Sequence, residues 1–188
     1  MLTALELFAS RLPKKAVVLD IGAGASDEIA CLNKRALLLD VCDYAITGVR
    51  FEAWPERPQQ YDGIFCSHTL EHVRNVGIFL DKIYRSLKIG GILGLVVPPA
   101  KQEIVGGHLT IWNAGLLLYN LIRAGFDCSE ASVASYDYNV AVVMRKKHAM
   151  YSATLLREDI GDIETLREFF PIPASQGFNG QISSVRWE

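Results

Sequence analysis

Val17-Val18-Leu19-Asp20-Ile21-Gly22-Ala23-Gly24 is the segment of this sequence that indicates its fold most clearly. Residues 16–21 form an apolar run that predicts a short buried strand, and Gly22 closes it. Residues 26–33 can begin a helix, with Ser26 or Asp27 as its cap. A strand, a glycine turn and a helix in this order are typical of the start of a nucleotide-binding fold.

The composition is that of an ordinary globular domain. The 188 residues are 50% hydrophobic and 21% charged, which predicts one domain with a substantial core. The net charge of -2 gives no indication of nucleic-acid binding, and no stretch is long and apolar enough to insert into a bilayer. The first residues do not have the pattern of a secretory signal, so we expect a cytoplasmic protein.

The cysteine spacing predicts no metal centre and no disulfide scaffold. Cys31, Cys42, Cys66 and Cys128 fit no zinc-site pattern and are too few to staple a chain of this length. We therefore expect four reduced thiols, most of them buried, and no bound metal.

Apolar periodicity predicts strands that alternate with helices. The expected strands are 16–21, 36–41, 49–51, 61–66 and 92–97, followed by an antiparallel hairpin of 126–134 and 138–144. The expected helices are 3–11, 26–33, 73–87, 114–124 and 163–170. This alternation predicts an α/β domain over residues 1–148 with a mostly parallel sheet and helices on both faces. Residues 149–188 are expected to be a C-terminal tail that packs on the domain or on a partner subunit.

Three acidic residues bear on which nucleotide the glycine turn binds. Asp27 stands where a dinucleotide fingerprint has its third glycine, and its charge would repel the pyrophosphate of NAD or FAD. Asp20 suits a ligand with positive charge near the loop, although it could instead cap its own turn. Asp40, which lies 20 residues after Asp20, can accept from both ribose hydroxyls or serve as a turn cap.

The sequence resembles the class I S-adenosylmethionine-dependent methyltransferases, in particular the small branch typified by quinone and sugar methylating enzymes. Four blocks carry the resemblance, in the family's order and near its spacing, over about residues 16–145. They are Val18-Leu19-Asp20-Ile21-Gly22-Ala23-Gly24, Leu38-Leu39-Asp40, Tyr61-Asp62-Gly63-Ile64-Phe65-Cys66-Ser67-His68-Thr69-Leu70-Glu71-His72-Val73 and Leu87-Lys88-Ile89-Gly90-Gly91-Ile92-Leu93.

The resemblance implies a Rossmann-like three-layer sandwich with a seven-stranded, mostly parallel sheet whose last strand is antiparallel. It also implies S-adenosylmethionine as the cofactor. The expected cofactor contacts are Asp20, Gly22, Ala23, Gly24, Asp40, Val41, Glu52, Cys66, Ser67 and His68. The third small position of the glycine loop is Ser26, and the segment between Asp40 and Tyr61 is short, so the helix after the second strand should be brief or missing.

Histidines are the candidates for a base on the acceptor side. Methyl transfer is an in-line displacement, and a base near neutral pKa helps a hydroxyl or amine to attack. His72 follows the third clear strand and either takes that role or holds its loop by hydrogen bonds. His108 lies in a glycine-rich segment that related enzymes fold over the substrate; the alternative is that it packs beneath this loop. His148 lies among basic residues and is expected at the surface.

The predicted function is methyl transfer to an oxygen or nitrogen of a small-molecule acceptor, with a sugar or glycan precursor as one candidate. The tail loosely resembles those of methyltransferases of surface-glycan assembly, which favours polysaccharide biosynthesis. Two alternatives remain open from the sequence: a non-catalytic cofactor-binding module of the same fold, and a nicotinamide-dependent oxidoreductase. The sequence also leaves open whether the chain forms a homodimer.

Overall fold

The computed structural model describes residues 1–24, 27–34, 36–152, 154, 156–159 and 161–188. In chain order its elements are α1 (Ala4–Arg11), β1 (Ala16–Ile21), α2 (Asp27–Asn33), β2 (Ala36–Cys42), α3 (Tyr44–Thr47), the 3-10 helix η1 (Phe51–Ala53), β3 (Tyr61–Ser67), η2 (Leu70–His72), α4 (Val76–Ser86), β4 (Leu87–Val97), α5 (Ala114–Arg123), β5 (Ser132–Tyr136), β6 (Asn139–Arg145), α6 (Asp162–Leu166), η4 (Arg167–Phe169) and β7 (Ser184–Val185). The predicted cap Ser26 and the side chain of Asp27 lie outside what the structure describes.

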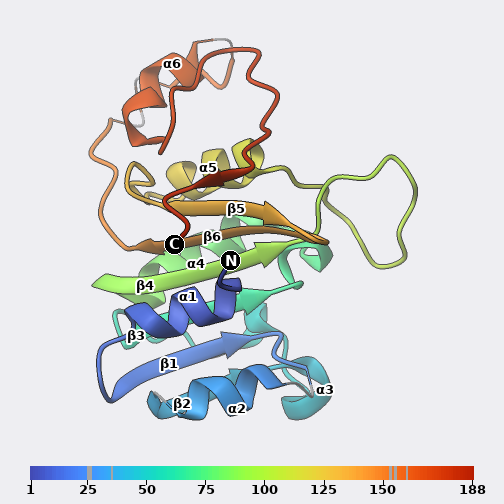
Figure 1. The fold of residues 1–188 in the computed structure, drawn as a ribbon, viewed down its shortest axis with the longest axis vertical. Coiled ribbons are helices and arrows are strands. Elements are labelled where there is room, and N and C mark those ends of the chain that lie inside the picture. The colour runs from blue at the N-terminus through green and yellow to red at the C-terminus, as the bar shows by residue number, and fades with distance from the viewer. Residues whose placement is uncertain (25–26, 35, 153, 155, 160) are drawn as a thin grey trace.

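The sheet has seven strands in the order β2-β1-β3-β4-β6-β5-β7 (Figure 1). The first four are joined by parallel ladders, whereas β6 is antiparallel to β4 and to β5, and β7 is antiparallel to β5. The predicted fold class is confirmed, and the predicted hairpin is β5 and β6. The sheet is more mixed than expected, because half of its ladders are antiparallel.

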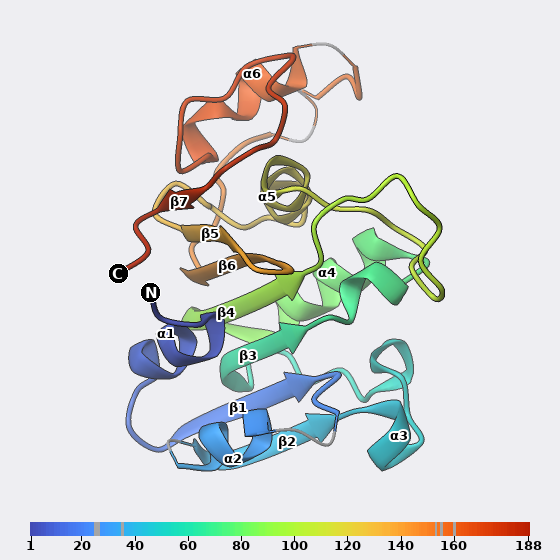
Figure 2. The same cartoon turned by 45° about the vertical axis from the view of Figure 1, so that its right-hand side comes forward.

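Two apolar layers enclose the sheet. Helices α1 and α2 cover one side of the sheet and α4 and α5 cover the other (Figures 1 and 2). Alternate residues of β1, β3 and β4 pack toward one side or the other. Val18 and Phe65 belong to the first layer, while Leu19 and Ile64 belong to the second. This alternation follows from the two-residue period of a strand. Because both faces of the sheet are covered by helices, a ligand can reach it at the carboxyl ends of the parallel strands.

Several predicted elements have different bounds. Residues 49–51 are not a strand, because Phe51 begins η1 and the amide of Trp54 donates to the Phe51 carbonyl at 3.1 Å. The helix predicted over 73–87 begins at Val76 and ends at Ser86, and β4 starts five residues earlier than expected. The hairpin's first strand is only Ser132–Tyr136, and the helix predicted over 163–170 divides into α6 and η4. The brief helix expected after β2 is α3, with four residues.

Residues beyond β6 run along the far edge of the sheet and over α5 (Figure 2). Leu166, Phe170 and Ile182 are buried in the same apolar cluster as α4 and α5. Near the end of the chain, the indole of Trp187 donates to the Leu2 carbonyl at 2.8 Å, so the two termini lie side by side. No helix in the described part of the chain has the length and apolar character needed to span a bilayer.

Candidate active site

A cavity of about 270 Å³ opens at the carboxyl ends of β1, β2 and β3. We call it the edge cavity. Gly22, Asp43, Glu52, His68 and His72 are among its lining residues. It comes close to the lower limit of small-molecule sites, about 300 Å³, and it lies where open α/β sheets bind their ligands.

The glycine turn forms one wall of the edge cavity. Gly22 has φ 77°, and a Cβ built on it would lie 1.8 Å from Oγ1 of Thr69. Thr69 follows β3, and its hydroxyl donates to the Ser67 carbonyl at 3.0 Å and the Ile21 carbonyl at 3.3 Å. Only glycine therefore fits between the ends of β1 and β3. Gly24 also has a positive φ, 59°, and apart from its chain neighbours no atom of the described residues lies within 4 Å of its Cβ position, which leaves room for a ligand there.

Asp43, the residue directly after β2, is an acid that lines this cavity together with Glu52. Its Oδ1 caps α3 by accepting from the amide of Ala45 at 2.8 Å, and its Oδ2 accepts from the amide of Gly24 at 3.0 Å. The same carboxylate thus fixes both the glycine turn and the start of α3.

Asp40, the predicted ribose contact, is engaged elsewhere. Its Oδ2 accepts from Arg57 at 2.9 Å and from the Tyr61 hydroxyl at 2.8 Å, and in the described structure it does not line the edge cavity. Burial, followed by the hydrogen bond to Asp40, raises the pKa of Tyr61 to about 12, so this phenol stays neutral and remains a donor.

A buried lysine holds the opposite wall. Nζ of Lys82 on α4 donates to the carbonyls of Phe51 at 2.7 Å, Glu52 at 3.1 Å and Trp54 at 2.6 Å. Burial lowers the pKa of this ammonium. These three bonds satisfy the end of η1 and so determine where Glu52 stands beside the cavity.

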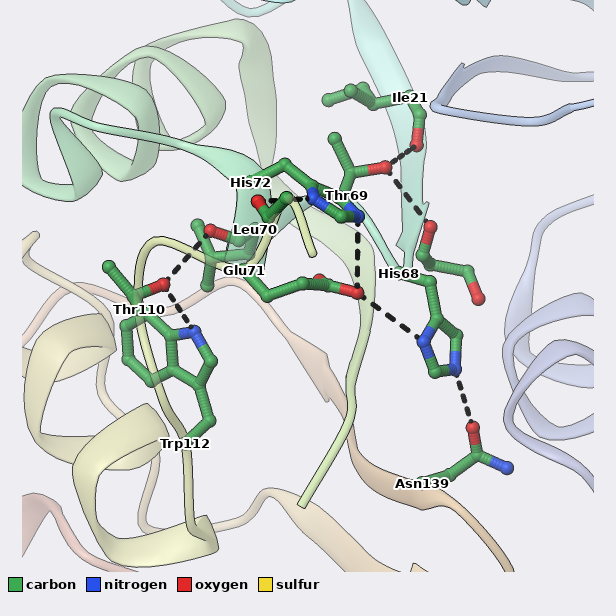
Figure 3. A network of polar contacts seen from close by, with 11 residues as sticks. Ile21, His68, Thr69, Leu70, Glu71, His72, Thr110, Trp112 and Asn139 are labelled. Carbon is green, nitrogen blue, oxygen red and sulfur yellow. Dashed lines mark hydrogen bonds and ion pairs between the residues drawn. The ribbon is translucent and has the colours of Figure 1, made fainter. Parts of the chain in front are cut away.

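The turn after β3 gathers ionisable groups around Glu71 (Figure 3). Glu71 is 1% exposed, and its Oε1 lies 3.4 Å from Nδ1 of His68 and 3.8 Å from Nε2 of His72. His68 has φ 46°, which is uncommon for a non-glycine residue, and its Nε2 lies 2.8 Å from Oδ1 of Asn139 on β6. Strained backbone of this kind occurs often at functional sites.

Residues 98–113 form a long loop that projects past the carboxyl ends of the strands (Figure 1). The carbonyl of Glu71 accepts from the amides of Leu109 at 2.7 Å and Thr110 at 3.2 Å, which ties the loop to η2. The rings of His72 and His108 meet edge to face, with centroids 5.2 Å apart. The structure therefore brings together two histidines that are far apart in the sequence.

A second cavity, of about 130 Å³, lies beneath this loop, and we call it the loop cavity. Lys101, Glu103, His108, Thr110 and Tyr138 are among its lining residues. Two ring contacts join it to the edge cavity. His72 of the edge cavity contacts His108 of the loop cavity, and His68 of the edge cavity stacks on Tyr138 of the loop cavity.

The predicted site residues divide by their position relative to the edge cavity. Gly22, Glu52, His68 and His72 line it, and His108 lines the loop cavity. The other predicted contacts do not line the edge cavity as the structure describes it: Asp20, Ala23, Gly24, Asp40, Val41, Cys66 and Ser67. Asp20, Ala23 and Cys66 are buried beneath it, and burial raises the pKa of the Cys66 thiol well above its usual value.

The sequence reasoning missed Asp43, Thr69 and Lys82. Asp43 carries a signal that was available, since an aspartate before a short helical segment is a typical N-cap. Thr69 and Lys82 act through contacts with residues that are distant in the sequence, and no local pattern marks them.

Comparisons with known proteins agree with this geometry. A family model described as a methyltransferase domain matches residues 1–151. A search of curated proteins finds no match.

Solved structures that share this fold include methyltransferases of low sequence identity to this chain. A SAM-dependent methyltransferase from Archaeoglobus fulgidus is 14% identical, with a TM-score of 0.63 over 76% of this chain and 91% of that one. The 1,6-didemethyltoxoflavin-N1-methyltransferase of Burkholderia thailandensis, solved with S-adenosylhomocysteine, is 18% identical, with a TM-score of 0.61 over 77% of this chain and 79% of that one. At these identities the likeness concerns the fold.

The fold and the glycine-lined cavity at its strand ends define a class I S-adenosylmethionine-dependent methyltransferase. The chain belongs to the methyltransferase-domain family whose model spans four-fifths of it, and its cofactor is S-adenosylmethionine. The nicotinamide-dependent alternative is therefore wrong.

Proposed function

We propose that this enzyme methylates an oxygen of a small polar acceptor, with a sugar or glycan precursor as the leading candidate. The observation that carries the proposal is the pair of adjoining cavities. The edge cavity has a wall of glycine backbone, and the loop cavity presents an ammonium, a carboxylate, a hydroxyl and an aromatic ring from Lys101, Glu103, Thr110 and Tyr138. Aromatic faces and polar groups together suit a hydroxylated ring.

The residues of the edge cavity fit S-adenosylmethionine. Backbone at Gly22 and Gly24 would lie against the methionine part, and Glu52 would lie on the adenine side. We assign the ribose hydroxyls to Asp43 in place of Asp40, because the Asp43 carboxylate lines the cavity. Asp20, Ala23 and Cys66 would shape the floor of the site from below, and Val41 and Ser67 would position the strand ends.

Bound in this cavity, the cofactor supplies a methyl group already activated by a positively charged sulfur. Transfer to a hydroxyl forms a carbon–oxygen bond, breaks the carbon–sulfur bond and releases the hydroxyl proton. His72 and His108 stand at the junction of the two cavities, where that proton must leave. The loop tied to Glu71 borders this junction and brings His108 to it.

The proposal is tested by incubating the full chain with methyl-labelled S-adenosylmethionine and a panel of monosaccharides and nucleotide sugars. We expect label in an O-methylated sugar, with transfer reduced at least about tenfold by His108→Ala. Label transferred only to nitrogen heterocycles would contradict the sugar assignment. Tight cofactor binding with transfer to no acceptor would favour the non-catalytic module.

The position of residues 171–188 does not favour the alternative that the chain is a non-catalytic cofactor-binding module. A tail folded into the cofactor site would block turnover, but in the described structure these residues line a different cavity, against α5. We call this the tail cavity; Phe178 and Gly180 lie on its tail side and Leu116 and Tyr119 on its helix side. The edge cavity is therefore left accessible by the tail.

A further inference from the structure

Glu71, His72 and His108 form a compact group of metal-ligating side chains. Their ligand atoms all lie within 4.8 Å of one another. Glu71 is 1% exposed, and its Oε2 has no hydrogen-bond partner among the described residues. A buried carboxylate oxygen without a partner is costly, because it has lost water and gained no replacement.

The ring of His72 is oriented as in a metal-bound histidine. Its Nδ1 lies 2.7 Å from the Gly107 carbonyl, which can only accept, so Nδ1 carries the proton in that bond. In the neutral ring, Nε2 then directs a lone pair at Oε1 of Glu71, 3.8 Å away. Two acceptors face each other there unless a proton or a metal cation lies between them. A carbonyl on the far ring nitrogen is the usual support of a histidine ligand.

His108 is held in place by the same turn. The amide of His108 donates to the Val105 carbonyl at 3.1 Å, and the next two amides donate to the carbonyl of Glu71. The Thr110 hydroxyl adds a bond of 3.3 Å to the Leu70 carbonyl (Figure 3). Because the loop is fixed to η2, the three side chains are brought together before any ion binds.

We propose that Glu71, His72 and His108 bind a divalent first-row transition ion such as Mn²⁺, Co²⁺ or Zn²⁺. Two imidazoles and one carboxylate favour these ions over Mg²⁺ or Ca²⁺ and leave coordination positions open. The ion lies between the edge cavity and the loop cavity, where it can bind an acceptor oxygen. This role rests on the proposed function. It makes the two histidines ligands of an ion that would lower the pKa of a bound hydroxyl, whose proton would pass to solvent water, instead of bases that accept that proton.

The test is ion binding by the full chain, treated with chelator and free of S-adenosylmethionine. Calorimetry with Zn²⁺ and Mn²⁺ should give one ion per chain. The Co²⁺ complex should absorb in the visible without a thiolate charge-transfer band, which separates this site from binding by the cysteines. His72→Ala and His108→Ala should each weaken ion binding at least about tenfold. Loss of a residue that only supports a metal ligand costs about 10–100-fold in metal affinity, and loss of the ligand itself should cost no less.

His148→Ala is the matched control, because His148 is exposed and contacts Tyr84, away from the group. It should leave ion affinity unchanged. If a histidine variant fails to fold, Glu71→Gln, of nearly the same shape, takes its place. Failure to bind any of the three ions, a thiolate band, or equal losses in His148→Ala and His108→Ala would overturn the proposal. Titration of the metal-free chain with S-adenosylhomocysteine reports separately on the methyltransferase function.

Discussion

At the scale of single residues, Gly22 and Thr69 make the most demanding contact of the site. Gly22→Ala places a Cβ 1.8 Å from the Thr69 hydroxyl at a φ of 77°, so the turn must shift. We expect a loss of about 1–3 kcal/mol in the free energy of unfolding and at least about tenfold weaker cofactor binding. Denaturant unfolding and calorimetry measure the two effects.

Gly77→Ala is the control for that substitution. Gly77 lies on the exposed side of α4, and no atom is within 4 Å of its Cβ position. This change should stabilise the protein by about 0.5–1 kcal/mol, because alanine is the better helix former, and leave cofactor affinity as it was. Equal cofactor affinity in both variants would contradict the proposed role of the glycine turn.

The two aspartates near the end of β2 provide a second contrast between residues. Asp43→Asn keeps one side-chain acceptor, for the α3 cap, but loses both the charge beside the edge cavity and the second acceptor, which receives the Gly24 amide. We expect it to weaken S-adenosylhomocysteine binding about tenfold or more, the effect of losing a charge-assisted hydrogen bond. Asp40→Asn, the same chemical change, should alter affinity less than about threefold and act on stability through Arg57 and Tyr61. If calorimetry shows a larger loss of S-adenosylhomocysteine affinity for Asp40→Asn than for Asp43→Asn, then Asp40 is the residue that binds the ribose.

At the scale of elements, α4 sets the position of η1 through one side chain. Lys82→Met removes three hydrogen bonds to the carbonyls of residues 51, 52 and 54. We expect a loss of about 1–3 kcal/mol in stability and a loss of about threefold to tenfold in cofactor affinity, because η1 carries Glu52.

Lys88→Met serves as its control. Lys88 is partly exposed and pairs with Asp62 at 2.6 Å, at the opposite end of the strands from the edge cavity. Its loss should cost at most about 1 kcal/mol, as for an exposed ion pair, with no change in affinity. If Lys82→Met binds cofactor as tightly as Lys88→Met does, then η1 is not part of the site.

Some helices and strands could be predicted from the sequence, and others could not. Strands β1 and β3 and helix α5 follow from local apolar patterns, and the structure has them near their predicted bounds. The structure of residues 49–51 does not follow from the local pattern. The Phe51 ring packs against the Phe79 ring, with centroids 4.9 Å apart, and the Lys82 ammonium donates to the Phe51 carbonyl, and both contacts favour a 3-10 helix. The seventh strand comes from the tail, where β7 adds to β5.

The site was predictable where one segment carries it and not where two segments meet. Gly22 and residues 68–72 were each predicted from one continuous motif of the sequence. The contact of His72 with His108, and the cation site inferred there, depend on a loop that returns to η2 from 36 residues away. The sequence predicted no metal because its cysteines fit no pattern. It placed both histidines on the acceptor side of the site but did not predict that they contact each other.

At the scale of the molecule, the tail and the domain share one core. Trp187→Ala removes a largely buried indole that packs against Tyr136 and donates to the Leu2 carbonyl. We expect a loss of about 2–4 kcal/mol in the free energy of unfolding, in a single transition. Cofactor affinity, measured well below the melting temperature, should change less than about threefold, because the tail lines another cavity. Glu188→Ala, an exposed neighbour, should change neither quantity. Separate transitions for domain and tail would show that the core is divided.

We expect S-adenosylmethionine to bind at the strand ends beside Gly22 and Asp43, facing His72. A crystal structure of the full chain with S-adenosylhomocysteine would show whether it does. We predict density in the edge cavity, with both ribose hydroxyls within hydrogen-bond distance of Asp43 and the sulfur directed toward His72 and His108. Density in the tail cavity, or a ribose held by Asp40 with the glycine turn unoccupied, would contradict the account.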